Sequence, residues 1–206
     1  MKNPWLAIPL ADYEGHMRSP QVQQADALSN LFAEAVGYCH PASVAILGIT
    51  GGNELSRLDD QITLRIVGLD VNPLYLDAVR QRYGHLQHLQ LYCCDLTEQV
   101  LGIEPVDLVH AALVFEHAGV GQCLDNALSL MVEGGTLSVV LQLPSKSAYN
   151  VGISEYSTIQ SLAPHFSLVD PCWFSNKLAD RQFRLRHQTR LSVSAGKELW
   201  MGIFGR

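Results

Sequence analysis

Val44-Ala45-Ile46-Leu47-Gly48-Ile49-Thr50-Gly51-Gly52-Asn53-Glu54-Leu55 decides the fold class of this chain of 206 residues. An apolar run ends here in a glycine-rich turn, and a segment compatible with a helix follows. Two later apolar runs also end in polar residues, Asp70 after residues 66–69 and Asp95 after residues 91–94. Three strand ends that carry a glycine turn and two acids predict a binding site for an adenosine-containing ligand.

The middle of the chain alternates between short apolar runs and segments with helical periodicity. Apolar runs without polar alternation suit strands buried on both faces of a parallel sheet. We expect such strands at residues 43–47, 64–69, 89–93, 106–111 and 136–143. Helices are predicted over residues 53–58, 73–83 and 121–132, the last of them ended by Gly134-Gly135. A first helix is predicted to begin at Ser19-Pro20 and to end at Gly37.

The two ends of the chain depart from this alternation. Residues 8–17 predict an irregular segment, and residues 157–165, 166–169 and 184–204 predict a helix, a strand and an antiparallel hairpin. The whole pattern predicts a doubly wound, Rossmann-like α/β fold, a mostly parallel sheet with an antiparallel C-terminal strand and helices on both faces. We expect one domain with three parts: a lid segment and helix (1–38), a cofactor-binding core (41–143), and a substrate-side and hairpin region (144–206).

Composition narrows the classes of function. The chain is 48% apolar and 17% charged, which is typical of a globular protein. Its 14 basic and 20 acidic residues give a net charge of −6, which argues against general nucleic-acid binding. Since no apolar stretch is long enough to span a membrane, we expect a soluble, cytoplasmic protein without a membrane partner. The five cysteines form no CxxC pair and are interpreted as small buried residues in a reducing compartment.

Each of these three strand ends can be given a chemical role. Gly48 and Gly52 remove side chains where the backbone must approach a ligand. Asp70 lies 22 residues after Gly48, where a carboxylate can accept hydrogen bonds from both ribose hydroxyls. Asp95 lies one strand further out, where it can accept a hydrogen bond from the adenine amine. The apolar residues that can sandwich the adenine ring are Val71 and Leu96.

The order and spacing of these motifs resemble the class I S-adenosylmethionine-dependent methyltransferases over residues 41–143. The similar segments are residues 47–53, 68–73, 94–96, 106–109 with 114–117, and 133–137. The resemblance implies a seven-stranded sheet, S-adenosylmethionine as the cofactor, and methyl transfer to a small-molecule acceptor. It places the cofactor contacts at Gly48, Ile49, Thr50, Gly51, Gly52, Asp70, Val71, Asp95, Leu96 and Ala112.

Two departures from the family pattern leave a second function open. Ile46 stands where the family usually has an acid that helps to hold the methionine end of the cofactor, and Thr50 replaces the middle glycine. A cofactor-binding or scaffold protein without catalysis is therefore the alternative hypothesis. A nicotinamide-dependent oxidoreductase is disfavoured, because residues 48–53 lack two glycines of GxGxxG and no tyrosine precedes a lysine by four residues.

Methyl transfer needs few catalytic side chains, because displacement at a sulfonium carbon mainly requires an aligned nucleophile and the exclusion of water. A base is needed only if the acceptor is protonated at the working pH. The catalytic candidates are His117, just past the fourth strand, and Tyr13 and His16 in the segment expected to fold over the cofactor. The substrate-contact candidates after the fifth strand are Tyr149 and Asn150. Glu116 beside His117 is too small a ligand set for a metal, so no metal is predicted.

Overall fold

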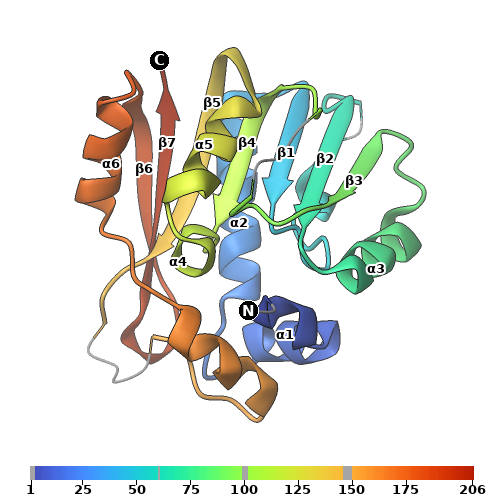
Figure 1. Ribbon diagram of the computed structural model, residues 1–206, viewed down its shortest axis with the longest axis vertical. Helices are drawn as coiled ribbons and strands as arrows, with labels where there is room; N and C mark the ends of the chain where they lie inside the picture. Colours follow the sequence, from blue (N-terminus) through green and yellow to red (C-terminus); the bar gives the residue numbers. More distant parts are fainter. Residues whose placement is uncertain (1–2, 60, 99–101, 146–149) are drawn as a thin grey trace.

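The computed structural model describes residues 3–59, 61–98, 102–145 and 150–206. Its centre is a seven-stranded sheet in the order β3-β2-β1-β4-β5-β7-β6 (Figure 1). The strands are β1 (Ser43–Leu47), β2 (Arg65–Asp70), β3 (Leu89–Cys93), β4 (Val106–Ala112), β5 (Met131–Gln142), β6 (Arg184–Ser192) and β7 (Glu198–Gly205). Strands β1 to β5 pair in parallel, and β7 runs antiparallel between β5 and β6. The predicted sheet and its antiparallel end are confirmed.

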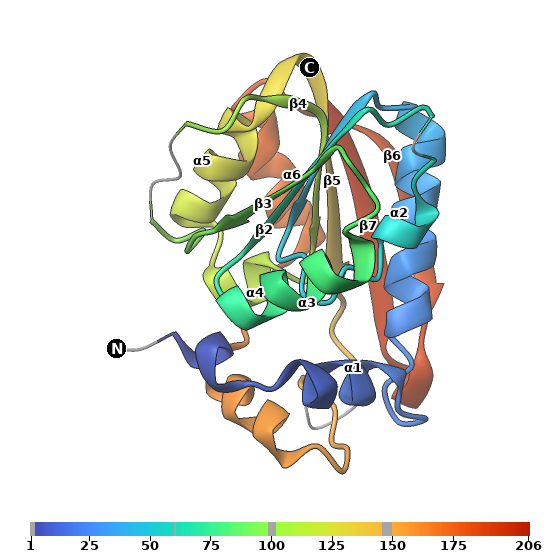
Figure 2. The same cartoon turned by 90° about the vertical axis from the view of Figure 1, so that its right-hand side faces the viewer.

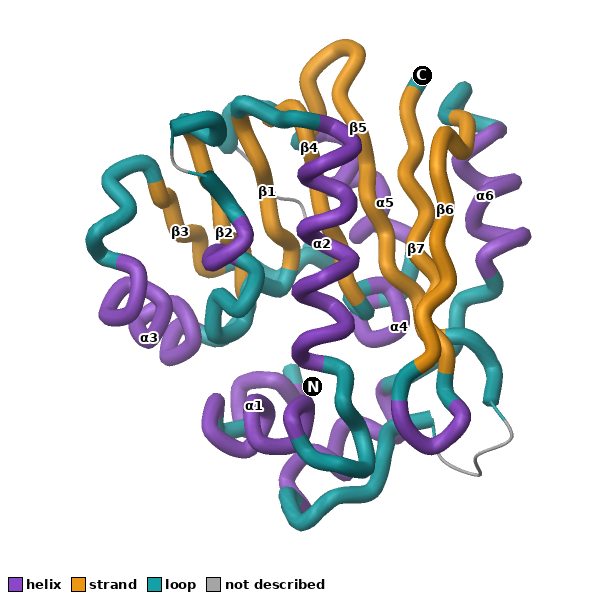
Figure 3. Tube along the Cα trace, turned by 180° about the vertical axis from the view of Figure 1, so that it is seen from behind, coloured by secondary structure: helices purple, strands orange, loops and turns teal. Residues whose placement is uncertain are grey.

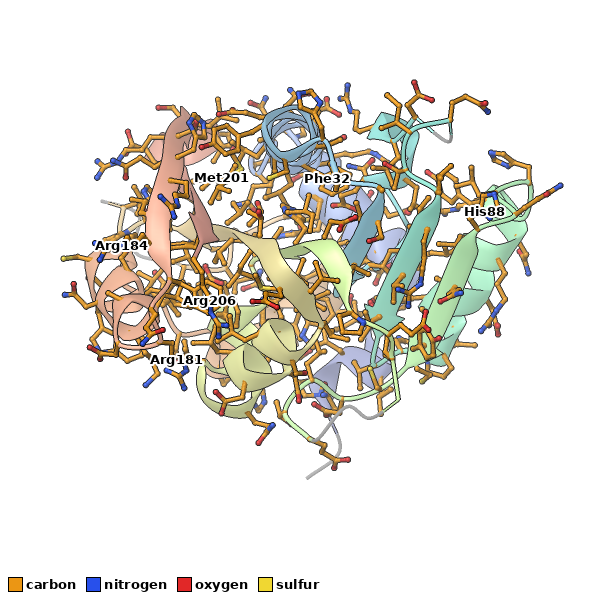
Figure 4. All side chains as sticks on the ribbon, turned by 90° about the horizontal axis from the view of Figure 1, so that it is seen from above. Phe32, His88, Arg181, Arg184, Met201 and Arg206 are labelled. Carbon is orange, nitrogen blue, oxygen red and sulfur yellow. The ribbon has the colours of Figure 1, made fainter. Side chains whose placement is uncertain are left out.

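Helices cover both faces of the sheet (Figures 2 and 3). One face packs against α2 (Ala25–Cys39) and α3 (Pro73–Tyr83), and the other packs against α4 (Phe115–Ala118), α5 (Gly121–Ser129) and α6 (Pro171–Ala179). Successive strand residues point to opposite faces, so Ile46 packs in the cluster that contains Phe32 of α2, while Leu47 packs in the cluster that contains Leu124 of α5. Figure 4 shows Phe32 and Met201 on the α2 side of the sheet and Arg181 on the other.

A lid covers the edge of the sheet at which the parallel strands end. It consists of the 3-10 helix η1 (Pro4–Ala7), helix α1 (Leu10–Arg18) and the 3-10 helix η3 (Ser157–His165), which lie together beyond the carboxyl ends of β1 and β2 (Figures 1 and 2). The Tyr75 hydroxyl on α3 donates a hydrogen bond of 2.9 Å to the Ile8 carbonyl. The Thr158 hydroxyl donates one of 2.6 Å to Oδ2 of Asp12, which joins η3 to α1.

The predicted helix start at Ser19-Pro20 is wrong. Residues expected to be irregular form α1, and the chain then turns before α2 begins at Ala25. The Ser19 hydroxyl donates a hydrogen bond of 2.8 Å to the His16 carbonyl, so it closes the end of α1 instead of capping α2. Helix α2 also continues past Gly37, and its left-handed cap is His40, with φ of 47°.

Three other segments differ from the prediction. The helix predicted over 121–132 ends at Ser129, and Gly134-Gly135 lie within β5. A side chain at Gly135 would meet the Val132 carbonyl oxygen at 2.9 Å, so this glycine permits the irregular pairing of β5 with β4. Residues 166–169 form no strand and instead lead into α6, which the sequence analysis missed. Within 53–58 only the 3-10 helix η2 (Leu55–Arg57) forms, and η4 (Ser194–Gly196) lies in the β6–β7 turn.

Burial corrects one expectation drawn from composition. Cys123 is buried, but Cys93 and Cys172 are exposed, so the interpretation of all five cysteines as buried residues is wrong. Within the described part of the chain, none of the helices has the length and apolar character needed to cross a membrane.

Candidate active site

A cavity of about 400 Å³ lies between the carboxyl ends of the parallel strands and the lid. Open α/β sheets bind ligands at this edge. Ten of the predicted site residues line the cavity: Tyr13, His16, Gly48, Thr50, Asp70, Val71, Asp95, Leu96, Ala112 and His117. The predicted residues outside its lining are Ile49, Gly51 and Gly52. The fold therefore brings most of the predicted site together from strands that are far apart in the sequence.

The three predicted residues outside the lining serve the packing of the glycine-rich turn. Ile49 is fully buried in the cluster on the α2 side of the sheet. Gly52 has φ of 78°, and a side chain there would meet the Tyr83 ring of α3 at 2.9 Å. A side chain at Gly51 would overlap the carboxylate of Glu14. These residues allow α1 and α3 to approach the turn, and their contacts with a cofactor stay predictions.

Asp70 ends β2 and is 5% exposed. Its Oδ2 accepts a hydrogen bond of 2.9 Å from the Thr50 N–H, and its Oδ1 accepts one of 2.8 Å from the Asn72 N–H. Burial raises the pKa of this carboxyl to about 6, although the backbone hydrogen bonds oppose the rise. Each carboxylate oxygen has a second lone pair. Asp70 can therefore hold the glycine-rich turn and still accept hydrogen bonds from ribose hydroxyls.

The two departures from the family pattern both lie beside this turn. Thr50 adopts φ of 48°, a left-handed conformation that costs a residue with a side chain about 1–2 kcal/mol. Its hydrogen bond to Asp70 helps to offset that cost. Ile46 is 2% exposed and packs beneath α2, so β1 brings no carboxylate to the cavity.

Asp95 follows β3 and is held by hydrogen bonds from two segments. Its Oδ1 accepts from the Thr97 N–H at 2.9 Å and from the Thr97 hydroxyl at 2.7 Å, and its Oδ2 accepts from the Asn3 side-chain amide at 2.9 Å. Burial alone would raise the pKa of this carboxyl, but the hydrogen bonds outweigh it and hold the pKa below its ordinary value. The cavity therefore has an ionised acid at its β3 end.

His117 lies in α4, beyond the end of β4. Its ring packs edge-to-face against Trp5 and against Phe166, with centroids 4.9 Å apart in both pairs. Its Nδ1 is buried and has no hydrogen-bond partner among the described residues. Burial, and then the charge of His165, lower the pKa of His117 to about 4. At neutral pH this imidazole is uncharged, the state that can accept a proton.

Tyr13 and His16 reach the cavity from α1. Burial, and then the nearby Glu54 carboxylate, raise the pKa of the Tyr13 phenol, so the phenol keeps its proton. Burial, and then the charge of Lys197, lower the pKa of His16 to about 4. Its Nδ1 lies 2.8 Å from the Ser154 hydroxyl. Both side chains therefore present neutral polar groups to the cavity at pH 7.

The cavity has further lining residues that the sequence analysis did not name. Gln142 ends β5, and a polar residue after an apolar strand is the same signal that identified Asp70. Trp5 and Phe166 gave no such signal, because they reach the cavity from the lid and from the residue that follows it. Asn150, a predicted substrate contact, also lines the cavity, whereas Tyr149 lies outside the described residues.

Comparison with known proteins finds one similar family. Residues 46–139 match the model of a family described as a methyltransferase domain. No curated protein matches the sequence significantly. Residues 46–139 are thus similar to a methyltransferase domain, and the seven-stranded sheet has the fold of the solved methyltransferase structures described next.

Solved structures share this fold at low sequence identity. The N-methyltransferase NodS from Bradyrhizobium japonicum WM9, in complex with S-adenosyl-L-homocysteine, superposes with a TM-score of 0.65 at 15% identity, covering 89% of this chain and 87% of that one. Magnesium protoporphyrin IX methyltransferase from Synechocystis PCC 6803 gives 0.64 at 16% identity, covering 89% and 82%. The [4+2]-cyclase SpnF gives 0.68 at 12% identity, covering 92% and 83%. At these identities the likeness shows the fold alone.

Proposed function

We propose that this protein transfers the methyl group of S-adenosylmethionine to a small-molecule acceptor. One observation carries the proposal: a single cavity joins the glycine-rich turn after β1, Asp70 after β2 and Asp95 after β3. These are the groups that an adenosine needs at three neighbouring strand ends. The methyltransferase domain matched by residues 46–139 supports the same assignment.

The residues present fit the cofactor. Asp70 offers free lone pairs for ribose hydroxyls, Asp95 offers an ionised acceptor for the adenine amine, and Leu96 is 8% exposed where it can contact the ring. When bound, S-adenosylmethionine supplies an electrophilic methyl group on a sulfonium. The chain itself supplies orientation and exclusion of water.

The acceptor side of the cavity lies under the lid and is largely neutral. The lid places Trp5 and Ile159 over it, Phe166 follows directly after η3, and His16 and His117 are uncharged at pH 7. A small acceptor would be shielded from water there, as methyl transfer requires. We assign His117 the role of accepting the proton of an acceptor hydroxyl or ammonium group. The N-methyltransferase and the porphyrin methyltransferase that share the fold support a small acceptor.

Calorimetric titration with S-adenosylhomocysteine tests the cofactor assignment, with NADH as the ligand control. We expect saturable binding of S-adenosylhomocysteine alone. Asp70→Ala should weaken it by about 1–3 kcal/mol. Asp107→Ala is the matched control. Asp107 also accepts two hydrogen bonds, both from Ser43, but it lies near the amino end of β4, away from the cavity. Equal binding by both variants would refute the role of Asp70.

Formation of S-adenosylhomocysteine during a screen of small hydroxyl and amine acceptors tests the transfer step. Turnover with one acceptor class would establish the activity. Tight cofactor binding without turnover on any acceptor would favour the alternative, a cofactor-binding protein without catalysis.

A further inference from the structure

Glu54 carries an unpaired oxygen next to the candidate active site. It precedes η2 in the turn that follows β1, and its Oε2 is buried without a hydrogen-bond partner among the described residues. A buried carboxylate oxygen that finds no donor is costly, and most such atoms in native proteins are paired. The atom therefore marks a place where a donor belongs.

The carboxylate of Glu54 borders a small chamber of about 30 Å³. Tyr13, Met17 and Thr50 line both this chamber and the large cavity, so the two spaces share one wall. A volume of about this size holds a group as large as a water molecule or an ammonium. A ligand in the large cavity could extend one small polar group past Thr50 toward Glu54.

The charges around the chamber favour a cation. Glu14, also in its lining, forms ion pairs with Arg82 and, at 3.8 Å, with Arg18. No ion pair of Glu54 occurs among the described residues, and burial raises the pKa of its carboxyl to about 7. Glu14 therefore already has cationic partners, whereas Glu54 is the acid of the chamber whose carboxylate has an oxygen without a donor among the described residues.

The order of the strands gives the order of groups along the cavity. Asp95 follows β3, Asp70 follows β2, and Thr50 follows β1, so the chamber behind Thr50 extends this series at the end away from Asp95. An adenine at Asp95 and a ribose at Asp70 would direct the methionine half of the cofactor toward Thr50. The methionine half carries an α-ammonium group, and no carboxylate comes from β1, where Ile46 packs in the core.

We propose that Glu54 accepts the α-ammonium group of the cofactor in this chamber. The inference rests on the proposed function. The carboxylate then gains the donor that it lacks in the protein alone, and the ammonium gains a buried counter-charge, an interaction stronger than a hydrogen bond between neutral groups.

A calorimetric comparison of three ligands tests the inference at pH 8, where the Glu54 carboxyl is ionised. The ligands are S-adenosylhomocysteine, its analogue without the amino group, and 5′-methylthioadenosine, which lacks the amino acid part. In the wild type, loss of the amino group should weaken binding tenfold or more. Glu54→Gln should lower the affinity for S-adenosylhomocysteine tenfold or more. Its affinity for the analogue without the amino group should stay within twofold of the wild-type value.

Two controls accompany this comparison. Methylthioadenosine should bind the wild type and Glu54→Gln within twofold of each other, because its contacts end before the chamber. Glu116→Gln is the matched variant. Glu116 also has a buried Oε2 without a hydrogen-bond partner in the described part of the chain, and burial raises its pKa to about 7, but it lies in α4. It should keep the wild-type preference among the three ligands.

The outcomes separate the inference from the proposed function. A wild type that binds neither S-adenosylhomocysteine nor methylthioadenosine refutes the proposed function itself. A wild type that binds both, with no loss on removal of the amino group, refutes the role of Glu54 alone, and this result needs no variant to fold. Equal weakening of all ligands by Glu54→Gln would also refute it, because Glu54 would then act only on the structure of the turn.

Discussion

The side-chain amide of Asn3 lies 2.9 Å from Oδ2 of Asp95, although 92 residues separate the two in the chain. This hydrogen bond joins the residue before η1 to the segment that follows β3. It is reinforced from the neighbouring strand, where the Asn72 side chain donates a hydrogen bond of 3.0 Å to the Trp5 carbonyl. The lid is thus fastened to the same strand ends that carry the acids of the cavity.

Asn3→Ala should therefore loosen the lid. A hydrogen bond to a charged group contributes roughly 1.5–3 kcal/mol when buried, and we expect about 1 kcal/mol here because the pair is only partly buried. Hydrogen exchange of residues 4–18 should become faster, and S-adenosylhomocysteine should bind more weakly. Asn30→Ala on α2 removes the acceptor of an exposed hydrogen bond donated by Arg57 of η2, and should leave both measurements unchanged. Unchanged exchange in Asn3→Ala would show that this contact does not hold the lid.

Two helical glycines should respond to alanine in opposite ways. At Gly37 of α2 nothing lies within 4 Å of an added side chain, so Gly37→Ala should stabilise the protein by about 0.5–1 kcal/mol. At Gly15 of α1 an added side chain would meet the Tyr156 ring, with Cε1 at 2.7 Å, so Gly15→Ala should lower the melting temperature. In a Tyr156→Ala background the penalty of Gly15→Ala should disappear. A penalty that persists there would place its cause elsewhere.

The buried Glu116 should make stability depend on pH. Burial raises its pKa to about 7, so between its ordinary pKa and pH 7 the folded chain holds more protons than the unfolded chain, and this group lowers stability as pH rises. Glu116→Gln lacks this loss. Its melting temperature relative to the wild type should therefore rise from pH 5 to pH 8, by an amount equivalent to about 1–3 kcal/mol. Exposed Glu133→Gln should follow the wild type throughout, and a flat difference for Glu116→Gln would contradict the buried carboxyl.

His117→Asn tests the proposed proton acceptor. We expect kcat to fall by about 10²-fold with an acceptor that must lose a proton, while the affinity for S-adenosylhomocysteine stays the same. Because the pKa of His117 is lowered to about 4, the wild-type kcat should show no loss from its protonation between pH 6 and pH 8. His88→Ala is the control, because His88 lies directly before the edge strand β3 (Figure 4), outside the lining of the cavity. Full activity in His117→Asn would exclude this role.

The sheet could be predicted because each strand is encoded locally. Buried parallel strands are short apolar runs, and some of them end in a polar residue, as β2 does in Asp70 and β5 in Gln142. A polar residue followed by proline did not always mark the start of a helix, as three such residue pairs show. Asn72 and Asp170 cap α3 and α6 ahead of a proline, whereas Ser19, with the same local signature, bonds backward to α1.

A lid from the N-terminal segment was expected from the family resemblance, but its helix α1 could not be predicted, because the order of this segment comes from tertiary contacts. Only His16 and Met17 of α1 are buried, so the helix has no apolar stripe that periodicity would detect. Its position depends on partners such as Thr158 and Ser154, more than a hundred residues away. Trp5 and Phe166 were missed for the same reason, since only the closed lid brings them to His117.

The separation of the lid's two halves along the chain has a consequence for folding order. Residues 3–18 are synthesised before the sheet, whereas their partners at 154–158 are synthesised after five of its strands. Contacts between such distant segments carry the cost of closing a long loop and form late. We therefore expect a nascent chain to assemble its parallel sheet first and its cavity last.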